Sequence, residues 1–318
     1  MALPSPSQNM QIMKVTWQGV YPALTTKFHE DGSLDLPLFR KNIRAQLEAG
    51  VHGIIIGGSL GEASTLTRSD KLELLEAALE ETAGAIPVVV NVAERATAEA
   101  IAVAQEAQAH GAHGLMVLPP MQYKATERET LDWFKDIAKS TDLPILVYNN
   151  PVDYKIEVTP DMFEELLQLP NIQAVKESTR DTTNVTRLIN RFGNERLRIL
   201  CGVDTIAIEE LVMGADGWVA GLVCAFPKET VAIYELVKAG RIEEARSIHR
   251  WFLPLLELDV SPQLVQNIKL AEAMVDLGSE HVRRPRQPLS GAERQRVIDI
   301  IERALAERPN VGVLRMRN

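Results

Sequence analysis

The first 226 residues alternate short apolar segments with longer segments of helical periodicity, and this alternation constrains the fold more than any other feature. Apolar strands separated by amphipathic helices indicate parallel pairing, with helices covering the sheet. Eight strands are expected, at residues 19–24, 51–56, 87–91, 114–118, 144–148, 172–175, 198–201 and 217–220. Eight such units are typical of a closed (β/α)8 TIM barrel, so the expected fold class is α/β.

An open, doubly wound sheet is the alternative fold for such an alternation. It would carry a glycine-rich dinucleotide fingerprint directly after its first strand. This chain has Thr25-Thr26-Lys27 at that place. The closed barrel is therefore the favoured interpretation.

Helix-end patterns support the same interpretation. Two pairs have the spacing of a capping box, Thr67 with Asp70 and Thr126 with Glu129. We expect Thr97 to cap the alanine-rich helix after the third strand, and Gly50 to end the helix over residues 36–49. A later helix is expected to end at Gly193, and another to span residues 204–213.

The chain changes character after Cys224, where strands give way to helices. Three helical segments are expected, at residues 228–239, 242–277 with a break near Ser261-Pro262, and 292–307. The first of them closes the eighth unit, and the others form a C-terminal helical extension. The expected organisation is an N-terminal arm (residues 1–16), the barrel strands and helices (17–226), and the closing helix with the extension (227–318).

Composition limits the partners and the compartment. The chain is 46% hydrophobic and 24% charged, which fits a soluble globular protein with a substantial core. A net charge of −9 argues against nucleic acid or an anionic membrane as the main partner. With only two cysteines, no signal-peptide pattern and no apolar run of membrane-spanning length, we expect a cytoplasmic protein that acts on a small molecule.

Active sites of such barrels lie at the carboxyl ends of the strands. Lys176 follows the sixth strand and shares a strand face with Ile172 and Ala174. Burial favours the neutral form of a lysine, and a neutral amine is a nucleophile. Taken alone, a lysine at a strand end more commonly extends to solvent. Lys27 competes for the same role, and the six histidines show no metal-ligand spacing.

Two further features accompany Lys176 at the same end of the expected barrel. Tyr148 ends the neighbouring fifth strand, so its hydroxyl is expected to reach the Lys176 amine and to shuttle protons while an imine forms. The turn Gly57-Gly58-Ser59-Leu60-Gly61-Glu62 offers backbone N–H groups and a hydroxyl to a substrate carboxylate. Together these features indicate an imine-forming site.

This combination resembles the N-acetylneuraminate lyase/dihydrodipicolinate synthase superfamily over roughly residues 17–306. Gly58-Ser-Leu-Gly-Glu62 is similar to its carboxylate-binding motif, Tyr148-Asn-Asn-Pro151 to its Tyr-Asn-x-Pro motif, and Val175-Lys176-Glu-Ser178 to its Schiff-base strand. The resemblance implies a 2-oxo acid or cyclic imine held covalently by Lys176, with no cofactor and no metal. It implies that Tyr148 is catalytic and that the acid is bound by Gly58, Ser59, Leu60, Gly202 and Val219.

Three departures bear on the substrate. Dihydrodipicolinate synthases carry an arginine for the aldehyde partner's carboxylate two residues after the Pro of Tyr-Asn-x-Pro, where this chain has Asp153. An anion at that place should repel such a partner. Their tyrosine that reaches across the dimer corresponds to Met121, and Leu60 replaces a second motif hydroxyl.

The segments Leu118-Pro-Pro-Met-Gln-Tyr-Lys124 and Trp218-Val-Ala-Gly-Leu-Val-Cys-Ala-Phe-Pro227 look most like those of the superfamily's 1-pyrroline-4-hydroxy-2-carboxylate deaminases, which act in hydroxyproline breakdown. The alternatives are a dihydrodipicolinate synthase, an aldolase or dehydratase for a 2-keto-3-deoxy sugar acid, and a non-catalytic sensor of a 2-oxo acid. The resemblance also implies a homotetramer built from dimers, with Met121 and Tyr123 near a neighbouring subunit's site.

Overall fold

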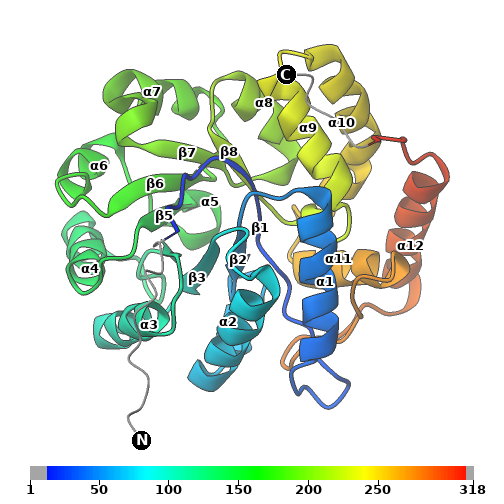
Figure 1. Cartoon of the computed structure of the whole chain (residues 1–318), viewed down its shortest axis with the longest axis horizontal. Helices are drawn as coiled ribbons and strands as arrows, with labels where there is room; N and C mark the ends of the chain where they lie inside the picture. Colours follow the sequence, from blue (N-terminus) through cyan, green and yellow to red (C-terminus); the bar gives the residue numbers. More distant parts are fainter. Residues whose placement is uncertain (1–12, 313–318) are drawn as a thin grey trace, which may run out of the picture.

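The computed structural model describes residues 13–312 and contains one eight-stranded parallel sheet. Its strands follow the order β1-β8-β7-β6-β5-β4-β3-β2, so each strand after β1 lies beside its neighbours in sequence. An isolated bridge pairs Ala23 with Ile55, and the Leu24 amide donates to the Ile55 carbonyl at 2.9 Å, which brings the two ends of the sheet together. The chain is a (β/α)8 barrel, as the alternation predicts (Figure 1).

The strands match their expected segments closely, except that β1, β2 and β4 are shorter and β6 is longer. The strands are β1 (Gly19–Pro22), β2 (Ile54–Ile56), β3 (Val88–Val92), β4 (Gly114–Val117), β5 (Ile145–Asn149), β6 (Ile172–Glu177), β7 (Arg198–Cys201) and β8 (Gly217–Ala220). The second strand was expected to begin at Val51. It begins three residues later because the Val51 amide donates to the Gln46 carbonyl, which makes Val51 part of the preceding helix end.

In the described residues, eight helices of six or more residues lie between these strands or directly after β8 and surround the barrel in Figure 1, and the one-turn α5 (Pro151–Tyr154) also follows β5. The eight are α1 (Leu36–Ala49), α2 (Arg68–Thr82), α3 (Thr97–Ala109), α4 (Glu127–Lys139), α6 (Pro160–Leu166), α7 (Thr183–Arg196), α8 (Ala207–Val212) and α9 (Pro227–Lys238). Both predicted capping boxes are present, at the start of α2 and of α4. Gly50 ends α1 in the left-handed conformation, as expected.

Two of the expected helix ends are wrong, at Thr97 and at Asp204. Ala96, not Thr97, is the N-cap of α3, and no side chain bonds the helix start there. The helix expected to end at Gly193 is interrupted there, because Gly193 takes a non-helical conformation with φ of 69°, and a further turn follows to Arg196. The expected helix 204–213 divides into a 3-10 turn, η2 (Asp204–Ile206), and α8.

The C-terminal extension consists of α10 (Ile242–Leu256), α11 (Leu264–Met274) and α12 (Gly291–Ala306). These helices gather beside α1 and α9 on one side of the barrel (Figure 1). The expected break near Ser261 is a complete interruption of residues 257–263 between α10 and α11. Asn42 of α1 donates to the Glu272 carboxylate at 3.2 Å and to the Leu277 carbonyl at 3.0 Å, which fastens the extension to the barrel.

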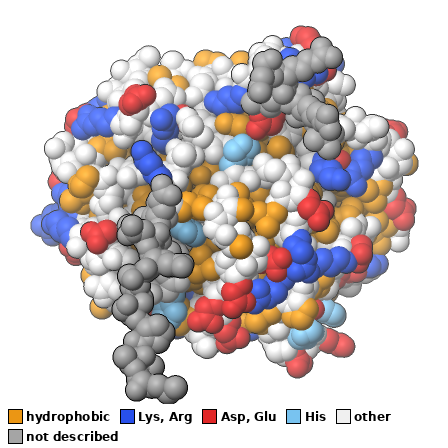
Figure 2. Space-filling view, viewed as in Figure 1, with side chains coloured by type: hydrophobic (Ala, Val, Ile, Leu, Met, Phe, Trp, Pro, Cys, Tyr) orange, Lys and Arg blue, Asp and Glu red, His pale blue; other side chains and the backbone are white. Residues whose placement is uncertain are grey.

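Most of the expected N-terminal arm lies outside the described residues. Within them, Val15 and Trp17 are buried, and the Trp17 indole donates to the Gln173 side chain at 3.2 Å. The face seen in Figure 2 shows hydrophobic atoms near the centre and interspersed acidic and basic side chains towards the rim. No helix in residues 13–312 is both long and apolar enough to cross a membrane.

Candidate active site

A cavity of about 110 Å³ opens at the carboxyl ends of the strands. It brings together all seven residues expected from the sequence to form the site: Gly58, Ser59, Leu60, Tyr148, Lys176, Gly202 and Val219. They come from three strands, β5, β6 and β8, and from the loops after β2 and β7. The geometry thus places them in one pocket, and their individual roles stay predictions.

Lys176 lies on the inner part of this pocket with only 8% of its surface exposed. Within residues 13–312, no carboxylate lies within ion-pair distance of its amine. Burial lowers the pKa of Lys176, and this effect outweighs the opposing influence of the nearby Tyr154 phenol and of the Asp259 and Asp204 carboxyls. A larger share of the amine is therefore neutral and nucleophilic than in an exposed lysine.

Lys27, the competing lysine, is fully buried outside the pocket. Its amine lies 2.7 Å from a carboxylate oxygen of Glu272 and is also bonded to the Thr25 hydroxyl. Neither side chain of the pair is exposed to solvent. A lysine held in a buried ion pair is positioned as a structural group, so the geometry favours Lys176 as the nucleophile.

Tyr148 contacts Lys176 differently from the sequence expectation. The two residues are register partners on β5 and β6, and the Lys176 amine lies 4.1 Å from the centroid of the Tyr148 ring. The Tyr148 hydroxyl instead accepts a hydrogen bond from Asn150 at 3.2 Å. The expected contact between hydroxyl and amine is therefore wrong for this structure, because direct pairing of the strands places the amine over the ring face. Burial raises the pKa of Tyr148 to about 12.

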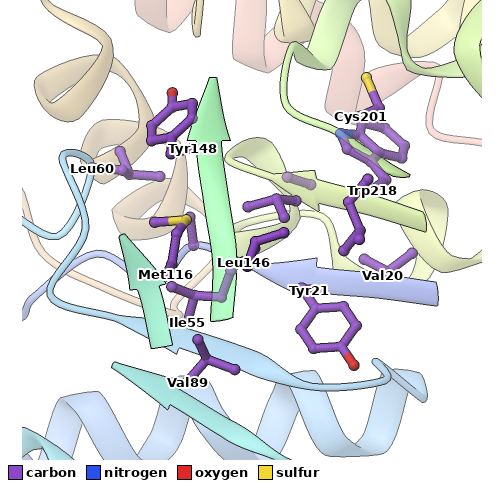
Figure 3. Packing of buried hydrophobic residues seen from close by; sticks show 14 of the residues in the cluster. Val20, Tyr21, Ile55, Leu60, Val89, Met116, Leu146, Tyr148, Cys201 and Trp218 are labelled. Atoms are coloured by element: carbon purple, nitrogen blue, oxygen red, sulfur yellow. The ribbon is translucent and has the colours of Figure 1, made fainter. Parts of the chain in front are cut away.

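Figure 3 shows Tyr148 at the head of the β5 arrow with Leu60 and Met116 beside it. Tyr21, another buried tyrosine, lies towards the opposite end of the barrel in the same view. The pocket lining thus combines apolar side chains such as Leu60 and Met116 with polar groups. A substrate in such a site is oriented by a few polar contacts and excluded from bulk water by the rest.

The glycine-rich turn after β2 is held closely against the barrel. A side chain at Gly61 would place its Cβ 2.9 Å from the Leu24 carbonyl oxygen, so only glycine fits there. Glu62 ends the turn, and its carboxylate lies 2.5 Å from the Lys269 amine of α11, with both groups fully buried. The Ser59 and Tyr154 hydroxyl oxygens are 2.6 Å apart.

Gly202 packs directly against the Lys176 side chain. An added Cβ at Gly202 would come within 2.7 Å of Lys176 Cγ and 2.1 Å of Ser178 Oγ. The Gly202 amide donates to the Glu177 carbonyl at 2.7 Å, which fixes this close approach. The absence of a side chain at Gly202 is therefore what leaves room for the extended lysine.

Several residues of the pocket were not expected from the sequence, among them Tyr154, Arg180 and Asp259. Tyr154 ends α5 (Pro151–Tyr154), a one-turn helix whose start has a readable sequence pattern, an asparagine followed by proline. Arg180 Nη2 lies 3.7 Å from the Asp153 carboxylate at the pocket. Asp259 comes from the connection between α10 and α11, where local sequence carries no such pattern.

A model of the dihydrodipicolinate synthetase family matches residues 16–304 of this chain. The chain belongs to this family. Its members are Schiff-base lyases that act on small molecules, so the protein is an enzyme of this class. The sequence resemblance to the superfamily is confirmed at this level.

Curated relatives and solved structures agree with the assignment. A 4-hydroxy-tetrahydrodipicolinate synthase from Methanothrix thermoacetophila is 29% identical over 288 residues, 90% of this chain and 96% of the relative. One from Exiguobacterium sibiricum is 32% identical over 276 residues, 86% and 92% of the two chains. The solved dihydrodipicolinate synthase from Aquifex aeolicus superposes with a TM-score of 0.86 at 27% identity, covering 90% of this chain and 97% of that one.

Proposed function

We propose that this enzyme forms an imine between Lys176 and a 2-oxo acid or its cyclic imine, and that it deaminates 1-pyrroline-4-hydroxy-2-carboxylate. The buried lysine without a paired carboxylate supports the imine chemistry. The solved synthase from Acinetobacter baumannii, 25% identical with a TM-score of 0.87 over 91% of this chain and 99% of that one, is a complex with pyruvate. A 2-oxo acid therefore suits the family.

The observation that carries the deaminase assignment is the charge of the pocket lining. Asp153 and Asp259 both line the pocket, and Arg180 is a basic side chain there besides Lys176. Arg180 already lies near the Asp153 carboxylate. Burial raises the pKa of the Asp259 carboxyl well above its ordinary value, so Asp153 is the group that disfavours a second carboxylate on the substrate. Both side chains can form hydrogen bonds with an amine or a hydroxyl at the far end of the substrate.

The reaction begins when Lys176 attacks C2 of the cyclic imine. The ring C2–N bond then breaks, which leaves a lysine imine and a free amine on C5. Loss of a proton from C3, made acidic by the imine, expels the C4 hydroxyl as water. Proton shifts from C5 then produce an imine at C5. Hydrolysis of both imines consumes two waters and releases ammonia, 2,5-dioxopentanoate and the free lysine.

This chain's residues bind and orient the intermediate. The backbone of Gly58 to Leu60 and the Ser59 hydroxyl lie where they can hold the carboxylate, so that C2 faces the lysine. Tyr148 serves in proton transfers that follow imine formation, since its hydroxyl, linked to Asn150, points away from the amine's position over the ring.

Ammonia release from 1-pyrroline-4-hydroxy-2-carboxylate tests the proposal directly. The purified enzyme should release ammonia, and Lys176→Ala should release none. Mass spectrometry after borohydride reduction should place the added mass on Lys176. A folded, pyruvate-trapping protein that releases no ammonia from this substrate would overturn the deaminase assignment and leave the imine chemistry intact.

A 4-hydroxy-tetrahydrodipicolinate synthase is the second candidate. Relatives carry that name, and Arg180 in the pocket is a cation that a second carboxylate would need. The same protein should then condense pyruvate with aspartate 4-semialdehyde. Condensation at a rate above that of ammonia release would favour this candidate over the deaminase.

The proposed assembly is a homotetramer, with Met121 and Tyr123 near the neighbouring subunit's site. Tyr123 is 58% exposed in the single chain and lies in the loop between β4 and α4. Met121 lies in the same loop and packs in part against the core. Light scattering at micromolar concentration measures the assembly, and a monomer would contradict the proposal.

A further inference from the structure

We propose that Tyr154 and Ser59 form the proton relay for imine formation at Lys176. This inference rests on the proposed imine chemistry, because a relay has no purpose without a nucleophilic lysine. It adds to the site a residue, Tyr154, that none of the sequence motifs includes. All three residues belong to one chain, so the relay needs no group from a second subunit.

The relay geometry is built from two separate loops. Ser59 follows β2 and Tyr154 ends α5, and the two hydroxyl oxygens lie 2.6 Å apart. Both side chains line the same pocket as the Lys176 amine. A separation of 2.6 Å is that of a short O–H···O hydrogen bond, along which a proton can pass from one oxygen to the other.

Tyr148 is less suited to this particular step. Its ring, not its hydroxyl, faces the Lys176 amine, and its hydroxyl is engaged by Asn150. The Tyr148 and Tyr154 rings meet edge to face with centroids 5.6 Å apart, which holds the second phenol beside the first. Tyr148 thus supports both the amine and Tyr154 through its ring.

The electrostatic coupling of Tyr154 to the amine supports the same assignment. Burial lowers the pKa of Lys176, and the Tyr154 phenol is the group that most strongly opposes this effect. Burial also raises the pKa of Tyr154 itself, so the phenol is protonated at neutral pH. A protonated phenol paired with a hydroxyl is suited to pass a proton along without becoming an anion.

The proton balance of the step is as follows. Lys176 Nζ forms a bond to C2 and loses one proton to the Tyr154 oxygen. The Tyr154 proton moves to Ser59, and the Ser59 proton moves to the departing atom, which is the ring nitrogen of a cyclic imine or the oxygen of a 2-oxo acid. Both hydroxyl groups end neutral, and Nζ and the departing atom are then each singly bonded to C2. A second passage of the relay carries the remaining Nζ proton to the departing atom, so its bond to C2 breaks, the C2=Nζ imine forms, and the departing group leaves as a free amine or as water.

The test measures how fast pyruvate is trapped on Lys176 by borohydride in a rapid-quench experiment, with mass spectrometry to locate the adduct. Tyr154→Phe and Ser59→Ala should each slow the trapping by roughly 10²-fold or more. The double variant should be no slower than the worse single variant, because the two hydroxyls act as one unit. We expect a solvent deuterium isotope effect on the trapping rate of the wild-type enzyme. The slower of the two single variants should lose most of this isotope effect.

Tyr234→Phe is the matched control. Tyr234 is a buried phenol on α9 whose hydroxyl donates to the Asp216 carbonyl at 3.3 Å, outside the pocket. Its trapping rate should stay within about twofold of the wild type. Trapping by Tyr154→Phe at the wild-type rate, or multiplying effects in the double variant, would overturn the relay.

The relay and the proposed function fail in different ways. No adduct on Lys176 in the wild-type enzyme would overturn the imine chemistry and the relay together. An adduct on Lys176 that forms equally fast in Tyr154→Phe would overturn the relay alone. If Tyr154→Phe does not fold, Ser59→Ala at saturating pyruvate and the isotope effect on the wild-type enzyme decide the question, because saturation removes the loss that comes from weaker carboxylate binding. A wild-type trapping rate for Ser59→Ala at saturation would overturn the relay.

Discussion

Tyr148 and Lys176 face each other across adjacent strands, with the lysine amine 4.1 Å from the centroid of the tyrosine ring. A ring face attracts a charged ammonium, whereas burial disfavours it. Burial is the larger effect and lowers the pKa of Lys176. The amine is therefore held in place by the ring and kept partly neutral by its surroundings.

The first prediction concerns pH. Because the folded-state pKa of Lys176 lies below its usual 10.5, the neutral amine is present at lower pH than in free lysine and disappears as the pH falls through that lowered pKa. The value of kcat/KM, measured from pH 5 to 10, should rise with pH, and the midpoint of this rise should lie well below 10.5. A midpoint near 10.5 would show that burial does not control this amine.

The second prediction separates the two phenols. Tyr148→Phe keeps the ring that supports the amine and removes only the hydroxyl, so pyruvate trapping should slow by less than about tenfold. Turnover should fall by roughly 10²–10⁴-fold, because the hydroxyl acts in later proton transfers. Rapid-quench trapping and steady-state turnover on the same preparation measure both. Equal losses in trapping and turnover would move Tyr148 to the imine-forming step.

The barrel could be predicted because its determinants are local. Capping boxes, helix-ending glycines and apolar strand segments are written in short windows of sequence, and eight repeats of them specify a closed barrel. The strand ends could not be predicted to the residue, since pairing with neighbours decides them. Val51 illustrates this point: its apolar side chain fits a strand, but its amide completes the end of α1.

The third prediction concerns Gly202. Gly202→Ala places a Cβ 2.7 Å from Lys176 Cγ and 2.1 Å from Ser178 Oγ, so the lysine must leave its extended position. Pyruvate trapping should fall by roughly 10²-fold or more, because a displacement of about 1 Å is costly to a reacting group. Circular dichroism should show a folded barrel. A fully active variant would show that the lysine reaches its substrate from another rotamer.

The fourth prediction concerns the ion pair behind the glycine-rich turn. Lys269→Ala leaves the buried Glu62 carboxylate without its amine, which should cost about 3–5 kcal/mol of unfolding free energy in a urea titration. Arg241→Ala is the control, because its pair with Glu244 is exposed to solvent and should contribute far less to stability than the buried pair. Equal losses of unfolding free energy in the two variants would show that the buried ion pair stabilises the fold no more than the exposed one.

The site residues at or just after strand ends could be predicted from the sequence, whereas those contributed by more distant connecting segments could not. Lys176 and Tyr148 are found from strand ends alone, because barrel topology gathers those ends. Tyr154 lies in a single helical turn, too short for hydrophobic periodicity to reveal. Asp259 reaches the pocket only because residues 257–263 fold over β8, where its carboxylate leaves no room for a side chain at Gly221. Such placement depends on tertiary packing.

The fifth prediction concerns Glu210 of α8, whose carboxyl is fully buried and whose two oxygens have no hydrogen-bond partner among the described residues. Burial raises its pKa from 4.5 to about 8. Its folded-state pKa thus exceeds the unfolded value, so the folded protein holds a proton that the unfolded chain releases above pH 4.5. Stability from this group is complete below pH 4.5 and is lost as the pH rises through 8.

Glu210→Gln cannot ionise, so it should gain stability over the wild type as the pH rises. The unfolding free energies of the two proteins should differ by a few kcal/mol more at pH 9 than at pH 5. Glu209→Gln, on the exposed neighbour in the same helix, removes the same charge and should show little change of this difference with pH. A constant difference between Glu210→Gln and the wild type would mean that Glu210 is ionised throughout, with its charge compensated by groups that the structure does not place beside it.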